Sequence, residues 1–208
     1  MPSKIPHERT GFDRRQTLIG LAAGLMAAGW TSPVLALSNA AARHLIDQLV
    51  GDLNKIINSG GSKATMYREF ENLFSKYADV PIIARSSLGV AWRRASAGQR
   101  RRYTAAFRGY MARKYGNRFR EFIGGKIVVT GVHKVKSGYL VSSVAHLKGQ
   151  APFAVDWQVS DKSGKNKMFN LFIEGISLLA TERTEVAAML DKRRGNIDKL
   201  IRDLKTAS

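Results

Sequence analysis

The spacing of apolar residues changes sharply at Gly124-Gly125, and this change limits the folds open to the chain. Before the two glycines, apolar residues recur every three or four positions, which is the period of an amphipathic helix. Helices are predicted over 38–57, 65–77 and 82–92, followed by a longer helix that begins after Ser96. Beyond the glycines, apolar residues alternate with a period of two, which is typical of strands with one buried face.

Four strands are predicted, over Ile127–Val135, Tyr139–Lys148, Phe153–Ser160 and Lys167–Glu174. Short turns rich in glycine separate them, and such turns join antiparallel neighbours. Two further helices are predicted at the end of the chain, over 183–193 and 197–204. The sequence therefore predicts an α+β fold of N-terminal helices, a four-stranded antiparallel meander sheet and C-terminal helices.

Residues 1–36 have the three-part pattern of an export signal. A polar, basic start precedes an apolar run from Leu18 to Trp30, which is shorter than the roughly 20 residues of a membrane-spanning helix. Val34-Leu35-Ala36 then matches the small-residue pattern of a cleavage site. Arg14-Arg15 before the apolar run resembles a twin-arginine signal. We expect export by this route and a mature domain of residues 37–208; the general secretion route and an uncleaved anchor or buried helix stay open.

The chain carries a formal charge of +18, from 34 Lys and Arg against 16 Asp and Glu. Residues 1–36 hold four basic and two acidic side chains, so the mature domain keeps +16. This balance favours an anionic partner, which can be nucleic acid, a membrane surface or an acidic protein. Export would take the domain away from chromosomal DNA and so favours the last two. The absence of cysteine excludes a disulfide framework and a thiolate site.

Basic residues gather between Arg93 and Arg120, interleaved with Tyr103, Phe107, Tyr110 and Tyr115. Such a mixture can bind nucleic acid. The rings, however, recur at the spacing of a buried helical stripe, which favours packing in a core over stacking on bases. The stripe rotates near Gly116, so the helix either breaks there or presents two apolar faces. A solvated basic face, contact with an anionic membrane or acidic partner, and nucleic-acid binding are the three interpretations.

The sequence contains no recognisable motif for catalysis or cofactor binding. His7, His44, His133 and His146 lack the spacings of a metal site. Asp156 and Glu174 could meet on neighbouring strands as a carboxylate pair, but Asp156 lies on a polar face and Glu174 ends its strand near basic residues. No nucleophile elbow, dinucleotide fingerprint or phosphate-binding loop is present. We therefore expect a protein that is not an enzyme and holds no metal and no cofactor.

Several short motifs occur in one order along the mature chain. They are Asp79-Val80-Pro81-Ile82-Ile83-Ala84-Arg85, Leu88-Gly89-x-x-Trp92, Arg102-Tyr103-x-x-Ala106-Phe107-x-x-Tyr110, Tyr115-Gly116-x-Arg118-Phe119, Val155-Asp156-Trp157, Ile173-Glu174-Gly175-Ile176-Ser177 and Arg183-Thr184-Glu185. Over about residues 40–204 this set resembles the MlaC family, also called toluene-tolerance proteins. The chain departs from the family pattern at Ser86, Asn170 and Val186, where an aromatic residue, Asp and Phe are usual.

The resemblance implies a periplasmic carrier that holds phospholipid acyl chains in an apolar pocket enclosed by the sheet and the helices. Members of the family carry lipid between an outer-membrane lipoprotein complex and an inner-membrane ABC transporter with a periplasmic lipid-binding subunit, and so maintain outer-membrane lipid asymmetry. The implied partners are therefore phospholipid as cargo and these two complexes, with no nucleic acid, and we expect a monomer. A hopanoid-associated branch of the family leaves the identity of the cargo open.

We expect the pocket to be lined by apolar residues of the predicted helices and strands: Leu88, Trp92, Phe107, Met111, Phe119, Val129, Val144, Val155, Trp157, Phe169, Leu171 and Ile173. A diacyl lipid has about 30 methylene and methyl groups, and exposing them to water costs on the order of 20 kcal/mol, so a carrier needs a comparable apolar lining. A filled core would use the same residues. A basic nucleic-acid-binding protein and an accessory protein with a solid core are the alternatives. Because a headgroup can remain near solvent, we expect weak selection among headgroups.

Overall fold

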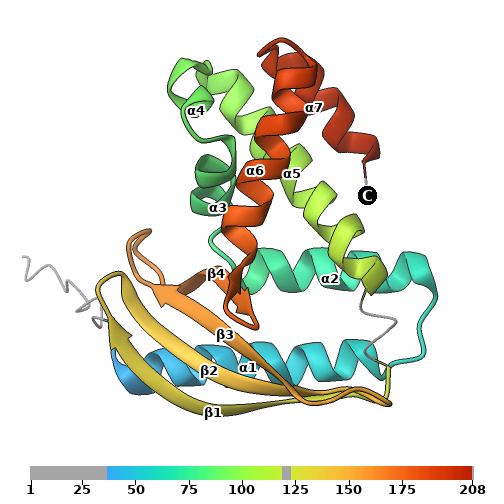
Figure 1. The fold of residues 1–208 in the computed structure, drawn as a ribbon, viewed down its shortest axis with the longest axis vertical. Helices are drawn as coiled ribbons and strands as arrows, with labels where there is room; N and C mark the ends of the chain where they lie inside the picture. The colour runs from blue at the N-terminus through green and yellow to red at the C-terminus, as the bar shows by residue number, and fades with distance from the viewer. Residues whose placement is uncertain (1–36, 119–122, 208) are drawn as a thin grey trace, which may run out of the picture. The chain divides into compact units, whose positions relative to one another are not determined.

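The computed structural model describes residues 37–118 and 123–207, which belong to one compact unit (Figure 1). The predicted export segment, residues 1–36, lies outside the described residues. Within the described part of the chain, no helix is both long enough and apolar enough to cross a bilayer.

Within the described residues, five helices precede the sheet: α1 (Asn39–Ile57), α2 (Lys63–Tyr77), α3 (Val80–Leu88), α4 (Ala91–Arg94) and α5 (Ala97–Arg118). Side chains that accept a backbone N–H begin most of them, namely Ser38, Ser62, Asp79 and Ser96. At α5 the cap is reciprocal, because Gln99 also accepts the N–H of Ser96 at 3.0 Å. These caps give α1, α2, α3 and α5 a defined first turn.

The helical run predicted over 82–92 is two helices rather than one. Gly89 has a φ of +59° and ends α3, and the chain turns before α4. Glycine adopts this conformation without the steric cost that a side chain would add. The long helix α5, by contrast, continues through Gly116 to Arg118, so the rotation of its apolar stripe marks two faces rather than a break.

The sheet is an antiparallel meander in the order β1 (Lys126–Val135), β2 (Gly138–His146), β3 (Phe153–Ser160), β4 (Lys167–Ile173) and β5 (Ile176–Ser177). The prediction of four strands is therefore wrong by one. Glu174 and Gly175, with φ of +50° and +77°, form a tight turn after β4 and return the chain for two paired residues. Two residues are too few to show a period of two, which is why the pattern did not reveal β5.

Two helices follow the sheet, α6 (Leu178–Lys192) and α7 (Ile197–Thr206), capped by Ser177 and Asn196. The start of α6 lies five residues before the predicted one. Asn170 contributes to this early start: its Oδ1 accepts the N–H of Leu179 and the hydroxyl of Ser177, both at 3.1 Å. β4, β5 and the first turn of α6 are thus held together by one side chain.

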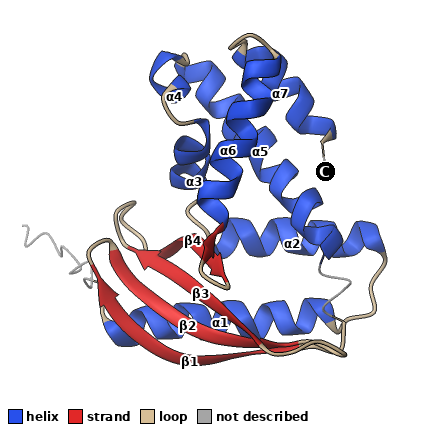
Figure 2. Ribbon diagram, viewed as in Figure 1, coloured by secondary structure: helices blue, strands red, loops and turns tan. Residues whose placement is uncertain are grey.

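The buried residues form two apolar clusters. One lies among α3, α5, α6 and α7 and includes Tyr103, Phe107 and Leu200; the other lies between α1, α2 and one face of the sheet and includes Ile46 and Val141. α1 packs along that face of β1, β2 and β3 (Figure 2). Phe70 and Met168 pack against both clusters. The space between the clusters is therefore bounded by apolar side chains on several sides.

Candidate functional site

A cavity of about 310 Å³ lies where the two clusters meet. Its wall is almost entirely apolar. The main contributors are Leu49 and Leu53 from α1, Phe70, Leu73, Phe74 and Tyr77 from α2, Met111 and Tyr115 from α5, Val155 and Trp157 from β3, Met168, Phe169, Leu171 and Ile173 from β4, and Leu178, Leu179 and Glu182 from α6. The volume lies at the lower end of the range of roughly 300–1,000 Å³ that is typical of small-molecule sites.

The sheet presents its apolar face to this cavity because alternate residues of β3 point inward. Val155, Trp157 and Val159 are buried, whereas the residues between them are more exposed. The indole N–H of Trp157 donates to the hydroxyl of Ser143 at 2.9 Å, and that hydroxyl donates to the carbonyl of Val155 at 2.7 Å. The polar edge of the Trp157 ring is thus satisfied within the sheet, and its carbon surface is free to line the cavity.

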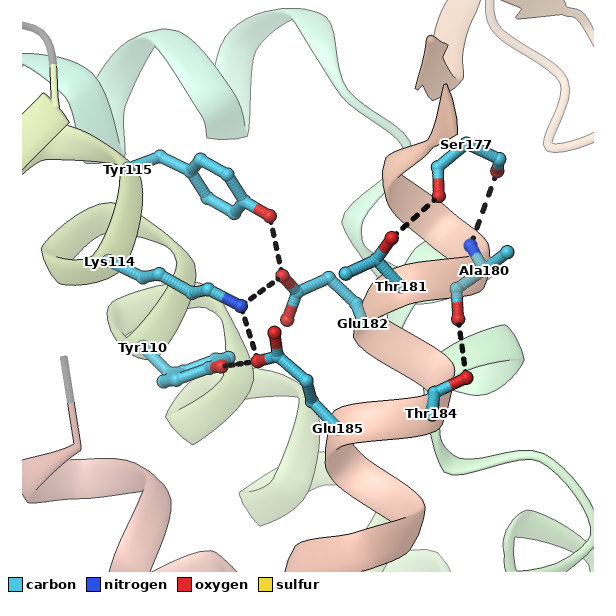
Figure 3. A network of polar contacts seen from close by, with 9 residues as sticks. All are labelled: Tyr110, Lys114, Tyr115, Ser177, Ala180, Thr181, Glu182, Thr184 and Glu185. Carbon is cyan, nitrogen blue, oxygen red and sulfur yellow. Dashed lines mark hydrogen bonds and ion pairs between the residues drawn. The ribbon is translucent and has the colours of Figure 1, made fainter. Parts of the chain in front are cut away.

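A polar network joins α5 to the first turns of α6 at one side of the cavity (Figure 3). Lys114 Nζ lies 2.6 Å from Glu182 Oε1 and also pairs with Glu185. The hydroxyl of Tyr115 donates to Glu182 Oε1 at 2.5 Å, and the hydroxyl of Tyr110 donates to Glu185 at 3.0 Å. Burial, together with the two carboxylates, raises the pKa of both tyrosines well above the usual range, so they stay protonated donors.

Glu182 is the one charged residue in the wall of the cavity within the described part of the chain. Its side chain is fully buried, and its Oε2 has no hydrogen-bond partner among the described residues. A buried carboxylate is expensive unless it is paired, and here the pairing comes from Lys114 and Tyr115. The network therefore fixes the end of α5 against α6 beside the cavity.

Six of the twelve residues predicted to line a pocket are in the wall of the cavity: Met111, Val155, Trp157, Phe169, Leu171 and Ile173. Leu88 and Phe107 are instead packed within the helical cluster, and Trp92 lines a groove on the surface. Phe119 lies outside the described residues.

Val129 and Val144 also lie away from the cavity. The strand register places Val129, Ser143 and Val155 side by side, so Ser143 takes the inward position on β2 and Val144 lies on the opposite face. Val129 shares the inward face but stands next to the irregularity in β1 between Val129 and Gly131, and it packs at the margin of the sheet cluster. An alternating pattern alone does not say which of two neighbouring apolar sets faces the core.

Several wall residues were not among the predicted ones. Leu49, Leu53, Leu73 and Phe74 belong to apolar stripes that the helical period detects, but the period cannot say which stripe faces a hollow. The sequence does not predict that Glu182 is in the wall, because its position in the helical pattern is that of an ordinary residue on the surface of a helix.

The aromatic residues interleaved with the basic run are not available for stacking on bases. Tyr103, Phe107 and Tyr110 are buried in the helical cluster. Several of the cations have protein partners: Arg102 pairs with Asp198 at 2.7 Å and Arg108 with Glu71 at 2.9 Å. The arrangement favours a core-packed helix with a basic outer face over a nucleic-acid surface.

The described residues hold no cluster of candidate metal ligands, and Asp156 and Glu174 do not lie opposite each other in the sheet. Within 37–118 and 123–207 there is no group of three or more His, Asp or Glu side chains that could hold a metal ion. Asp156 is paired in register with Phe172, while the carboxylate of Glu174 accepts the backbone N–H of Ala154. Asp156 and Glu174 therefore do not form the carboxylate pair considered from the sequence.

Comparison with known proteins matches the chain to a family model and to solved structures. The family model described as MlaC protein matches residues 43–206. The fold is also similar to that of a phospholipid-binding protein from Ralstonia solanacearum, solved in complex with a phospholipid, with a TM-score of 0.68 and 19% sequence identity. That match covers 78% of this chain and 94% of the Ralstonia chain.

Proposed function

The chain belongs to the MlaC family, and we propose that it is a phospholipid carrier whose cavity shields acyl chains from water. The observation that carries this proposal is the apolar cavity between the sheet and the helices. A filled core would serve a structural protein equally well, but it would leave no such space. The complex of the Ralstonia protein with a phospholipid supports the same ligand class for this fold.

The physical role of the wall is to replace water around the lipid tails. Burying each methylene group is worth about 0.8 kcal/mol, so the transfer of acyl-chain carbons from water into the cavity is favourable by an amount that grows with every buried carbon. Phe70, Phe74, Trp157 and Phe169 contribute large carbon surfaces to this lining. No bond is made or broken in this process, so the proposed protein is a carrier and not an enzyme.

The family suggests where the carrier works. We propose that residues 1–36 direct export by the twin-arginine route, and that the mature domain, residues 37–208, is a monomer in the periplasm. There it would shuttle phospholipid between an outer-membrane lipoprotein complex and the lipid-binding subunit of an inner-membrane ABC transporter, and so maintain lipid asymmetry. The charge of +16 on the mature domain suits contact with anionic surfaces on that route.

Mass spectrometry of lipid extracted from the purified protein tests the proposal. We expect about one phospholipid per protein molecule. Leu171→Gln places an amide in the cavity wall and should lower lipid occupancy at least tenfold, because the amide loses water without gaining a partner.

Phe172→Gln is the matched control, since Phe172 is the next residue on β4 and faces the other side of the sheet, opposite Asp156. Its occupancy should equal that of the unchanged protein. The proposal is contradicted if the unchanged protein carries no lipid, or if lipid occupancy falls equally in both variants.

A further inference from the structure

A groove on the surface lies between α5, the start of α3 and the turn that joins β3 to β4. Its volume is about 670 Å³. Five basic residues line it, and we call it the basic groove: Arg100, Arg101 and Arg108 from α5, Lys165 from the turn, and Lys167 from β4. Residues that are far apart in the sequence thus bring positive charge to one place.

Two of these cations are free to bind. Arg101 and Lys165 are exposed and have no hydrogen-bond or ion-pair partner within the described residues. The other three are engaged: Arg108 Nε lies 2.9 Å from Glu71, Arg100 Nε donates to the carbonyl of Trp92 at 3.0 Å, and Lys167 donates to the carbonyl of Lys76. The engaged cations hold the wall of the groove in place while the free ones face solvent.

The groove holds more positive than negative charge. Among the described residues that line it, Asp79 is the one acidic side chain, and it is buried, with one oxygen accepting the N–H of Ile82 at 3.2 Å. Burial and the charge of Lys165 lower the pKa of Lys167, while Asp79 opposes this shift. An anion in the groove would relieve the repulsion between the two lysines.

Apolar surface accompanies the charge. Trp92 lies in the groove, with the guanidinium of Arg100 5.5 Å from the centre of its ring. Val90, which precedes α4 in the chain, is 59% exposed, and Arg93 and Arg94 of α4 are exposed as well. A tryptophan, an exposed apolar side chain and several basic residues are the combination that binds at the interface of an anionic bilayer.

From these observations we infer that the basic groove and α4 form a docking surface for an anionic phospholipid bilayer, with a lipid headgroup phosphate held between Arg101 and Lys165. An acidic protein would also be attracted to the cations, but the exposed Val90 before α4 and the tryptophan at the groove favour a lipid interface. This inference goes beyond the proposed carriage of lipid, because membrane contact and cargo binding use different parts of the fold.

Sedimentation of the purified protein with vesicles tests the inference. Vesicles of phosphatidylcholine with about one third phosphatidylglycerol should bind the protein, and pure phosphatidylcholine vesicles should bind it much less. A double variant, Arg101→Gln with Lys165→Gln, should weaken binding to the anionic vesicles by roughly tenfold to thirtyfold, since each basic residue at such a surface contributes about a fivefold effect.

Lys126→Gln with Lys148→Gln is the matched control. Both lysines are exposed and lie outside the groove, and the two substitutions remove as much positive charge as those at Arg101 and Lys165. It should change vesicle binding less than threefold. Equal loss in the two double variants would mean that net charge alone drives binding and overturns the inference. Unchanged vesicle binding by the Arg101 and Lys165 double variant would also overturn the inference, and would favour an acidic protein as the partner of the groove. Lipid extracted from each variant reports cargo carriage separately, so failure of one proposal is distinguishable from failure of the other.

Discussion

Lys114 Nζ lies 2.6 Å from Oε1 of Glu182, a carboxylate that is fully buried beside the apolar cavity. The pair joins α5 to α6, although the two residues are 68 positions apart in the sequence and the whole sheet lies between them in the chain. Because the lysine is shared with Glu185, the cluster holds two carboxylates and one ammonium. Its stability therefore depends on that one lysine and on the two tyrosine hydroxyls.

Lys114→Met should destabilise the protein by about 3 kcal/mol, because it leaves Glu182 buried without its charged partner. Urea unfolding followed by circular dichroism measures the difference. The double variant Lys114→Met with Glu182→Met should recover most of the loss, since two apolar side chains can replace a buried ion pair at little cost. A double variant as unstable as Lys114→Met alone would show that the pairing is not the cause.

The contact between α1 and α2 predicts a dependence on pH. Asp52 accepts the hydroxyl of Tyr77 at 2.7 Å and pairs with Lys76 at 2.9 Å, and these bonds lower its pKa from 3.8 to about 2. A carboxyl whose pKa is lower in the folded protein than in the unfolded chain stabilises the fold at pH values above its unfolded-state pKa. This stabilisation is lost as the pH falls through its folded-state pKa. Asp52→Asn should thus be about 1 kcal/mol less stable at pH 6, after allowance for solvent screening, and the difference should vanish near pH 2.

Thermal unfolding of both proteins between pH 2 and pH 7 tests this dependence. Asp47→Asn is a suitable comparison, because Asp47 also lies on α1 and its ion pair, with Arg43 at 3.4 Å, is exposed on both sides. Its effect should stay below about 0.5 kcal/mol at every pH. If the difference in stability between Asp52→Asn and the unchanged protein does not decrease below pH 4, the lowered pKa of Asp52 is not its cause.

Much of the fold could be predicted because local signals and tertiary structure agree. Phe153–Ser160 was predicted with its observed bounds, since β3 has one buried face and clear turns on both sides. The caps at Ser96 and Asn196 lie where their sequence pattern places them. β5 and the division at Gly89 were missed because each depends on a positive φ at one or two residues rather than on a periodic pattern.

The cavity could be predicted only in part, because period identifies buried faces and not the spaces between them. Trp157 and Leu171 lie in the wall, but Phe107, on an equally clear stripe, fills the helical cluster. Which stripe borders a hollow depends on how α2, α5 and the sheet pack, and that involves residues distant in the sequence. Glu182 looks like a surface residue until α5 brings Lys114 and Tyr115 to it.

The turn between β1 and β2 gives a further prediction. Gly138 has a φ of +135°, and a Cβ atom there would lie 2.0 Å from the carbonyl oxygen of Val159 on β3. Gly138→Ala should therefore cost about 3 kcal/mol or more, or prevent folding, because the backbone of β3 must move. Gly149→Ala, also at a positive φ but with open space around it, should cost only about 1 kcal/mol. Equal losses in the two variants, measured by urea unfolding, would contradict the close approach.

The hydrogen bond between Trp157 and Ser143 links the order of the sheet to the shape of the cavity. Ser143→Ala removes the acceptor for the buried indole N–H and should cost about 1–3 kcal/mol. Ser142→Ala is the control, because Ser142 is its neighbour on β2 and faces the other side of the sheet. Because the indole ring of Trp157 then lacks its hydrogen bond, the lipid occupancy of Ser143→Ala should also fall. The lipid occupancy of Ser142→Ala should equal that of the unchanged protein. Full occupancy in a destabilised Ser143→Ala protein would show that the orientation of Trp157 matters to folding alone and not to the cavity.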